Sequence, residues 1–214
     1  MRLVIAIDGP AASGKGTLAR QLASVFSLPY LDTGLLYRAV GRKLLLAQQD
    51  PSNKYLAVEA AAALSPRDIL RDDLRGLDAA DAASKVATNT EVRAALFHFQ
   101  RSFVEKSGGV VDGRDIGTVI LPDADVKFFI TADLAARAQR RWLELQNAGV
   151  FTTLDDVQSE MITRDLRDST RAAAPLRAAE DAHYIDTTLL SAETVFELAK
   201  EIVLSRAPCT STIS

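Results

Sequence analysis

The chain has 214 residues, which is enough for one α/β domain with a substantial core and an insertion. Its hydrophobic content of 48% and its charged content of 25% are close to the averages for globular proteins, so the composition argues against disorder. The formal net charge of −3 gives no positive field that would attract nucleic acid or an anionic membrane. We therefore expect a globular protein that binds neither.

The cysteine content and the apolar runs predict a compartment. The single cysteine, Cys209, cannot form an internal disulfide, which is typical of proteins in a reducing environment. The N-terminal apolar run is too short for a signal peptide and ends at Asp8, and no apolar stretch approaches the length of a membrane span. Cys and His clusters with zinc-ligand spacing are absent. We expect a cytoplasmic protein.

The first predicted element is a strand over residues 3–8, followed by the glycine-rich segment 9–17, GPAASGKGT. The apolar run indicates a buried strand of a parallel sheet, and the segment after it is typical of a phosphate-binding loop. Glycines allow such a loop to turn its amides inward as an anion nest at the N-terminus of the next helix, and Lys15 adds a full positive charge. The residues expected to bind the nucleotide are Gly9, Ala11, Ala12, Ser13, Gly14, Lys15, Gly16 and Thr17.

The end of this loop departs from the common Gly-Lys-Ser/Thr pattern. Gly16 occupies the hydroxyl position and Thr17 follows one residue later, which resembles the loop of nucleoside monophosphate kinases. That resemblance implies ATP as the donor. It also implies a Mg²⁺ ion that is held mainly by phosphates and water. The one protein group that could ligate this ion directly is a carboxylate at the end of a later strand.

The remaining pattern alternates strands with helices, which predicts a three-layer α/β fold with a central parallel sheet. Residues 48–81 differ, because they are rich in alanine and broken by Pro51 and Pro66, and we expect a small inserted subdomain there that extends toward residue 105. Further strands are expected at 29–32, 109–112, 126–130 and 184–186, and helices at 34–46, 82–105 (one or two), 134–148, 154–167 and 191–204.

Polar residues follow two of these strands, at the edge of the sheet where ligands of open α/β folds bind. Asp32 and Thr33 follow the second strand, and Arg38 comes one helical turn later. Asp112 ends an apolar pair, as the Mg²⁺-facing aspartate of a Walker B strand does, and Arg114 and Asp115 come directly after it. Because Arg114 and Asp115 are adjacent, they could serve two partners, a phosphate and the edge of a base.

Two groups of arginines occur on predicted helices in the second half of the chain. Arg164, Arg167 and Arg171 fall on one face at spacings of three and four, so they repel one another unless an anion or a carboxylate such as Asp168 intervenes. A solvated face of ion pairs is one interpretation, and beside a phosphate-binding loop a row of arginines that faces phosphates is at least an equal one. Arg137, Arg140 and Arg141 precede a turn at Gly149. The two helices around that turn, residues 137–170, resemble a mobile lid over phosphates.

The chain resembles the bacterial-type cytidylate kinases from Val4 to Val203. Five segments, which occur in the same order as in that family, carry the resemblance. They are residues 7–17, residues 31–38, residues 82–87 with Val92-Arg93, residues 112–118, and residues 164–176. The resemblance implies a single phosphate-loop kinase domain over residues 1–214 that moves a phosphoryl group from ATP to CMP or dCMP with Mg²⁺. It also implies residues 48–81 as the acceptor-binding insertion.

The resemblance further implies individual roles. Asp115 would accept a hydrogen bond from the cytosine amino group, and Ser84, Arg93 and Arg171 would bond the acceptor side of the base. Asp168 and Arg164 would hold the sugar, and Arg38 and Arg114 the CMP phosphate, with Thr33 in the same pocket. The charge of the transferring group would be stabilised by Lys15, Arg114, Arg140, Arg141 and Arg164.

Two departures and two alternatives accompany this resemblance. The insertion is shorter than in many family members, and Thr33 stands where serine is common. One alternative is another small kinase with a phosphate-binding loop, acting on a different nucleotide or a metabolite. The other is a GTP-dependent switch, which needs an Asn-Lys-x-Asp motif, whereas Asn53-Lys54 is followed by Leu56 at the Asp position. We expect a monomer, because lid and insertion need free surface to move.

Overall fold

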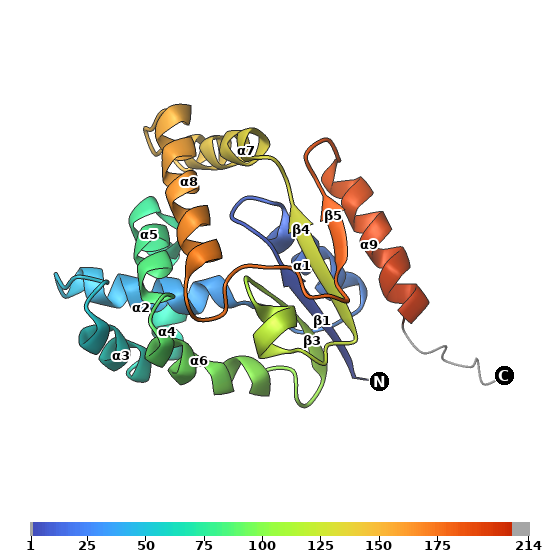
Figure 1. The fold of residues 1–214 in the computed structure, drawn as a ribbon, viewed down its shortest axis with the longest axis horizontal. Helices are drawn as coiled ribbons and strands as arrows, with labels where there is room; N and C mark the ends of the chain where they lie inside the picture. Colours follow the sequence, from blue (N-terminus) through green and yellow to red (C-terminus); the bar gives the residue numbers. More distant parts are fainter. Residues whose placement is uncertain (1, 207–214) are drawn as a thin grey trace.

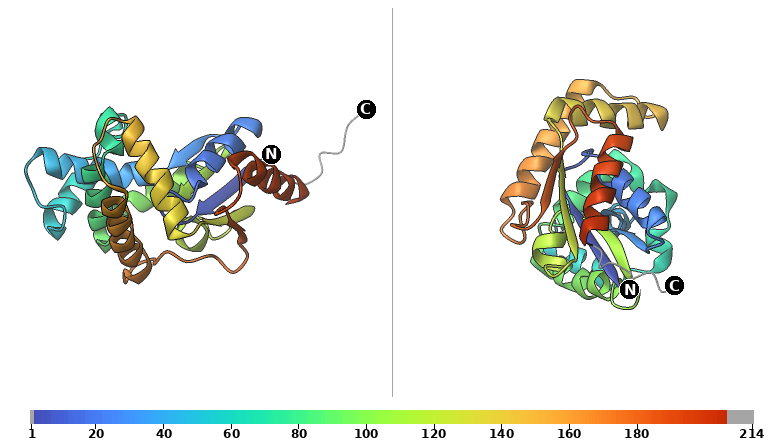
Figure 2. Two further views of the ribbon diagram at one scale, coloured as in Figure 1. Left: turned by 90° about the horizontal axis from the view of Figure 1, so that it is seen from above. Right: turned by 90° about the vertical axis from the view of Figure 1, so that its right-hand side faces the viewer.

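The computed structural model describes residues 2–206 and contains a five-stranded parallel sheet in the order β2-β3-β1-β4-β5 (Figure 1). The strands are β1 (Leu3–Asp8), β2 (Tyr30–Asp32), β3 (Gly108–Gly113), β4 (Val126–Thr131) and β5 (His183–Asp186). Helices lie on both sides of the sheet, so the expected α/β fold with a central parallel sheet is confirmed (Figure 2). Each predicted strand is present to within about one residue of its expected ends.

The helices fall into a group around the sheet and two groups that extend from it. The first group comprises α1 (Lys15–Val25), α2 (Thr33–Leu46), α9 (Ala192–Arg206) and the π-helical turn η2 (Ile116–Ile120). The region expected as an insertion and the helix after it comprise α3 (Lys54–Ala62), α4 (Pro66–Ile69), the 3₁₀ turn η1 (Asp72–Arg75), α5 (Leu77–Val86) and α6 (Thr90–Ser102). The region expected as a lid comprises α7 (Leu134–Asn147) and α8 (Leu154–Thr170).

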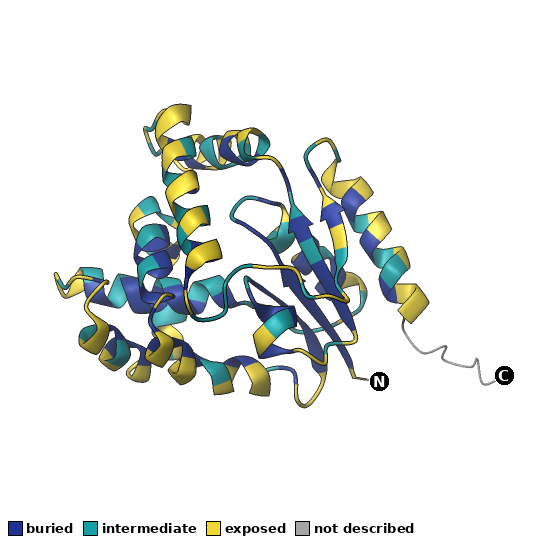
Figure 3. Cartoon of the chain, in the orientation of Figure 1, coloured by how far each residue is buried: buried dark blue, intermediate teal, exposed yellow. Residues whose placement is uncertain are grey.

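Alternation along β1 divides the core between the two faces of the sheet. Ile5 and Ile7 pack with Leu22 of α1 and Val203 of α9, and all four are fully buried. On the other face, Val4 and Ala6 pack against η2. The strands β1, β3 and β4 are accordingly buried along most of their length, whereas the edge strands β2 and β5 are less buried and the outer surfaces of α8 and α9 are exposed (Figure 3). Burial of both faces explains why the strands are nearly continuous apolar runs.

The carboxyl ends of β1, β2 and β3 bring three carboxylates to one edge. Asp32 and Asp112 are register partners, and Asp8 pairs with Gly113. The Asp8 carboxylate accepts hydrogen bonds from the amides of Ile116 and Gly117, both at 2.8 Å, and thereby fixes the first turn of η2. Burial raises the pKa of Asp8 to about 6, in spite of these two hydrogen bonds, which lower it.

The helical part between α2 and β3 differs from its expected boundaries. We expected helix from residue 82, but α5 begins at Leu77, directly after Gly76, and a break before Thr90 separates it from α6. α5 packs so closely on α2 that a Cβ at Gly41 would lie only 2.7 Å from that of Ala82. The alanine-rich composition therefore forms a helix-on-helix contact between small residues.

Within residues 2–206, no helix is both long and apolar enough to cross a membrane. Cys209, for which we predicted no internal disulfide, lies outside the described residues.

Candidate active site

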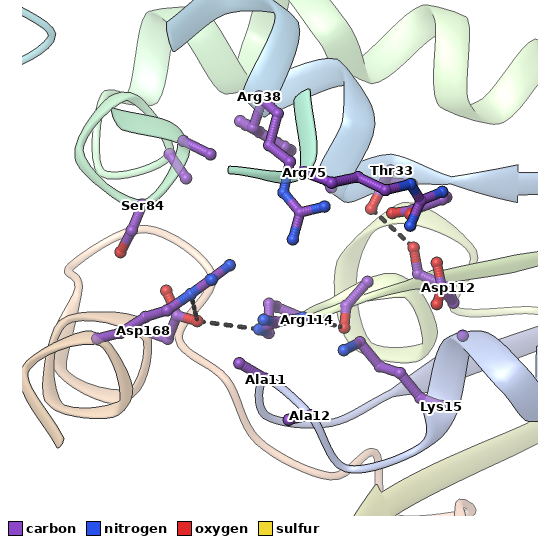
Figure 4. A pocket seen from close by; sticks show the side chains of 18 of the residues that line it. Ala11, Ala12, Lys15, Thr33, Arg38, Arg75, Ser84, Asp112, Arg114 and Asp168 are labelled. Carbon is purple, nitrogen blue, oxygen red and sulfur yellow. Dashed lines mark hydrogen bonds and ion pairs between the residues drawn. The ribbon is translucent and has the colours of Figure 1, made fainter. Parts of the chain in front are cut away.

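A cavity of about 470 Å³ opens at the carboxyl edge of the sheet, between the phosphate-binding loop, α2, the insertion and the lid (Figure 4). It is lined by seventeen of the residues predicted from the sequence, which are Ala11, Ala12, Gly14, Lys15, Gly16, Thr17, Thr33, Arg38, Ser84, Arg93, Asp112, Arg114, Asp115, Arg141, Arg164, Asp168 and Arg171. Three other predicted residues, Gly9, Ser13 and Arg140, do not line this cavity.

Gly9 and Ser13 shape the loop from behind. A Cβ at Gly9 would lie 2.0 Å from the carbonyl oxygen of Ile130, so only glycine permits this approach of the loop to β4. Ser13 is fully buried, and its carbonyl oxygen accepts a hydrogen bond of 3.0 Å from the Thr187 hydroxyl. Gly14 adopts a φ of +90° directly before α1, which turns the chain into the helix.

Lys15 and Asp112 face each other across the loop. The Lys15 ammonium donates to the Pro10 carbonyl at 3.1 Å, and burial, with the nearby charge of Arg114, lowers the pKa of Lys15 to about 7. Burial and the charge of Asp32 raise the pKa of Asp112 to about 7. An arriving phosphate would favour the charged form of Lys15, because opposite charges stabilise each other strongly where water is excluded.

We therefore expect the protein to take up a proton when ATP binds at pH 8. The Lys15 pKa of about 7 leaves the amine largely neutral in the free protein at this pH, and bound phosphates raise it. ATP affinity should accordingly fall as the pH rises above about 7. Titration calorimetry with excess EDTA, in buffers of different ionisation enthalpy, would measure the uptake. Lys15→Arg, which stays protonated, should abolish most of it, and equal uptake by both proteins would contradict this prediction.

The residues around Asp112 fit a magnesium ion. Its Oδ1 atom is buried and has no hydrogen-bond partner within residues 2–206, while a Cβ at Gly16 would lie 3.2 Å from Oδ2. Glycine therefore keeps open the space beside the carboxylate. Thr17 also lines the cavity, and its hydroxyl accepts a hydrogen bond of 3.4 Å from Arg20. Carboxylate, hydroxyl and phosphate oxygens are the hard ligands that Mg²⁺ prefers.

A buried cluster of paired charges occupies another part of the cavity. The Asp115 carboxylate forms ion pairs with Arg93 of α6 and with Arg171, the latter at 3.0 Å. Arg93 also donates to the Tyr37 hydroxyl at 3.3 Å. Ser84 of α5 lies in the same cavity with a buried hydroxyl that has no partner within the described chain. The cluster is thus a desolvated set of donors and acceptors with capacity left for a polar ligand.

Between this cluster and the loop lie guanidinium groups. Figure 4 shows Ser84 and Asp168 on one side, Lys15 and Asp112 on the other, and Arg38, Arg75 and Arg114 between them. Arg114 donates to Asp168 at 2.9 Å, and Arg164 approaches the same carboxylate at 4.0 Å. Arg38 has no carboxylate partner within residues 2–206 and a buried, unpartnered Nε atom. The Thr33 hydroxyl donates to the Asp112 carbonyl at 2.8 Å.

The family model described as cytidylate kinase matches residues 5–205. The chain belongs to the cytidylate kinase family. The cytidylate kinase of Granulibacter bethesdensis is 55% identical over 208 residues, which cover 97% of this chain and 100% of that protein. The cytidylate kinase of Paramagnetospirillum magneticum is 52% identical over 210 residues, covering 96% and 100%. An uncharacterized protein from Eubacterium ventriosum shares the fold, with a TM-score of 0.58 at 17% identity, covering 95% and 99% of the two chains.

Membership of the cytidylate kinase family confirms the resemblance and decides against both alternatives. The Asn-Lys pair has a structural role here, because the Asn53 side chain accepts hydrogen bonds from the amides of Tyr55 and Leu56 and caps α3.

In this cytidylate kinase, the predicted lid arginines point to different places. Arg141 lines the main cavity, where it donates to Glu144 at 3.1 Å and to the Arg75 carbonyl at 3.2 Å. Arg140 instead donates to the Thr187 hydroxyl at 2.9 Å and to its carbonyl oxygen at 2.6 Å. With Thr187 it lines a second cavity of about 230 Å³ on the other side of the phosphate-binding loop. The catalytic role of Arg140 stays a prediction.

The three arginines predicted to share one face of α8 do not form one surface toward the cavity, because Arg164 and Arg171 line it and Arg167 does not. Helix α8 ends at Thr170, and Arg171 follows with an extended backbone that turns its side chain toward Asp115. Arg167 remains on the helix and forms an ion pair with Asp81 of α5 at 3.1 Å. The directions of the Arg167 and Arg171 side chains therefore differ from those predicted for a helix that continues through Arg171.

Sequence reasoning also missed lining residues of this cavity. Arg20 and Arg75 line it, although we gave neither of them a role. Both are single arginines in polar surroundings without a motif, whereas Tyr37, which also lines the cavity, belongs to the predicted segment 31–38.

Proposed function

We propose that the protein transfers the γ-phosphoryl group of ATP to CMP or dCMP, giving ADP and CDP or dCDP. Membership of the cytidylate kinase family supports the reaction. The observation that carries the proposal is the division of one cavity into a buried hydrogen-bonding cluster around Asp115 and a phosphate-binding loop with Lys15. A nucleoside monophosphate has a matching division between base and phosphate.

The Asp115 cluster suits cytosine. The exocyclic amino group would donate to Asp115, and the N3 and O2 acceptors would receive hydrogen bonds from Arg93, Ser84 or Arg171. Both guanidiniums already contact the carboxylate, so the cluster is preorganised, and the free Ser84 hydroxyl supplies an additional group. A base with reversed donors and acceptors would leave these buried groups unpaired, which costs binding energy.

The sugar and phosphate would continue from this cluster toward the loop. Asp168 and Arg164 are the groups we assign to the sugar, and Arg38 and Arg114 those we assign to the phosphate. Asp168 holds Arg114 at 2.9 Å, which supports an orientation of the guanidinium fixed before the ligand arrives.

The chemical step needs no general base, because the acceptor is already a phosphate anion. One of its oxygens forms a bond to the γ-phosphorus of ATP, and the bond between that phosphorus and the β,γ-bridging oxygen breaks, leaving ADP. Lys15, Arg141, Arg114 and Arg164 would stabilise the spreading negative charge. Mg²⁺, when bound beside Asp112 and Thr17, would neutralise part of the phosphate charge.

We assign the nucleoside part of the donor, ATP, to the second cavity. It lies against Gly14 and Thr17 of the phosphate-binding loop and is otherwise lined partly by apolar side chains such as Leu18 and Leu190. A nucleoside in this cavity could extend its phosphates along the loop toward Lys15. Arg140 would then act on the donor side. We also expect a monomeric, cytoplasmic enzyme that binds neither nucleic acid nor membrane.

A panel of acceptors tests this function. We expect Mg²⁺-dependent formation of ADP from ATP with CMP and dCMP, and much less with UMP, AMP, GMP or shikimate, measured with a coupled assay. Turnover with a different acceptor would retain the kinase chemistry and overturn the assignments around Asp115. Nucleotide binding without turnover of any acceptor would overturn the proposed reaction.

A further inference from the structure

Arg75 lines the main cavity, although it belongs to none of the motifs considered above. It is the last residue of η1, directly before Gly76, the residue that precedes α5. Within residues 2–206, its guanidinium takes part in no hydrogen bond or ion pair, and its side chain is exposed. An exposed arginine of this kind is often only solvated, so its direction and surroundings decide whether it acts on a ligand.

The backbone at Arg75 is held from several sides. Leu74 is fully buried, and Arg42 of α2 binds Asp73 at 2.8 Å and Asp78 at 2.7 Å, which ties both flanks of Arg75 to α2. The Arg75 carbonyl accepts the hydrogen bond from Arg141 of the lid. The side chain therefore extends from a fixed point, and only its own rotamers are free.

From that point the side chain reaches into the cavity. Figure 4 shows the Arg75 guanidinium between Ser84 and Thr33, on the same side of the cavity as Arg38. Burial is the main cause that lowers the pKa of Arg38, the nearby Asp32 carboxylate raises it, and the charges of Arg141, Arg114 and Arg75 lower it further. Two guanidiniums that repel each other in an enclosed space require an anion to stabilise them together.

The charge balance of the lining indicates where such an anion would bind. Carboxylates pair with Arg93, Arg171, Arg114, Arg164 and Arg141. Among the cations of the described cavity lining, Lys15, Arg20, Arg38 and Arg75 form no ion pair with a carboxylate. Lys15 and Arg20 belong to the phosphate-binding loop and α1, whereas Arg38 and Arg75 lie toward the acceptor side.

We propose that Arg75 binds the phosphate of the acceptor nucleotide together with Arg38. This inference rests on the proposed function, because it takes CMP or dCMP as the acceptor. A guanidinium fork offers two parallel donors to phosphate oxygens, and the exposed starting position allows Arg75 to close over a phosphate that Arg38 has already bound. Arg75 would thus add affinity for the phosphate and contribute nothing to recognition of the base.

The experiment compares CMP with cytidine, which lacks the phosphate, in wild-type protein and in Arg75→Gln. Titration calorimetry should show CMP binding weakened about tenfold or more in the variant, as expected for loss of a charge-assisted hydrogen bond. Cytidine binding should stay unchanged. Arg75→Lys should recover part of the CMP affinity, because it keeps the charge. Arg71→Gln is the matched control, since Arg71 is exposed, lies beside η1, pairs with Asp73 and does not line the cavity.

Each of five outcomes would overturn the inference. CMP binding by Arg75→Gln equal to that of Arg71→Gln would mean that Arg75 is only solvated. Equal losses for CMP and cytidine would indicate a structural role, and a raised KM for ATP alone would place Arg75 on the donor. If the wild-type protein bound no CMP, the proposed function would be overturned as well. If Arg75→Gln turned over CMP normally and bound it with unchanged affinity, only the role of Arg75 would be overturned.

Discussion

Replacing Lys15 with alanine should lower kcat by about 10²-fold or more. The ammonium lies at the wall of the main cavity, where the donation to the Pro10 carbonyl fixes its position and the surrounding side chains partly bury it. In such an environment, a positive charge directed at the developing negative charge stabilises the transition state more than it would in water. The measurement is steady-state turnover of CMP with saturating ATP and Mg²⁺.

Lys200→Ala is the control for this experiment. Lys200 lies on α9, pairs with Glu197 and does not line the cavity, so its loss removes one lysine charge without touching the loop. It should retain wild-type kcat. If Lys15→Ala kept near wild-type turnover, Lys15 would not stabilise the transferring group.

The second large effect is expected for Asp115→Ala, which should raise the KM for CMP far more than that for ATP. The carboxylate is 5% exposed and pairs with two guanidiniums that are themselves buried. Its loss removes the acceptor for the cytosine amino group and leaves Arg93 and Arg171 without their partner. Removal of one member of a buried ion pair typically costs about 3–5 kcal/mol, so thermal stability should also fall.

ATP binding provides the check that the variant remains folded. Glu197→Ala is a suitable control, because Glu197 also pairs with a cation, Lys200, but has a 52% exposed side chain and lies outside the cavity. It should change neither KM. Equal increases of both KM values in Asp115→Ala would indicate a structural role for Asp115 and would contradict the assignment to the base.

The parallel sheet could be predicted from the sequence because each buried strand is a short apolar run, and both ends of such a run are marked by polar or glycine residues. The start of α5 could not, since Leu77 begins that helix after a glycine and within an alanine-rich stretch whose periodicity is weak. The π-helical turn η2 also lacks a local signal. Its first turn is held by Asp8, which precedes Ile116 by 108 residues.

Site residues in motifs were found because the phosphate-binding loop and the strand ends give each a defined place at one edge of the sheet. Arg167 shows the limit of this approach, since its spacing suggested a phosphate-facing row but the end of α8 separates it from Arg171. The partners of Asp115 are a similar case. Arg93 and Arg171 lie 22 and 56 residues away in the sequence, so no local pattern reports that they meet at one carboxylate.

We expect the uneven pairing of charge in the cavity to influence the direction in which a nucleotide docks as well. At Asp115 the positive charges are already shared with a carboxylate, whereas Arg38 has no such partner within the described chain. A phosphate that entered toward Asp115 would gain little and would approach a negative group, while the opposite orientation brings it to free cations. Because charge acts over a longer range than hydrogen bonds, we expect the ligand to be oriented before any edge of its base makes contact.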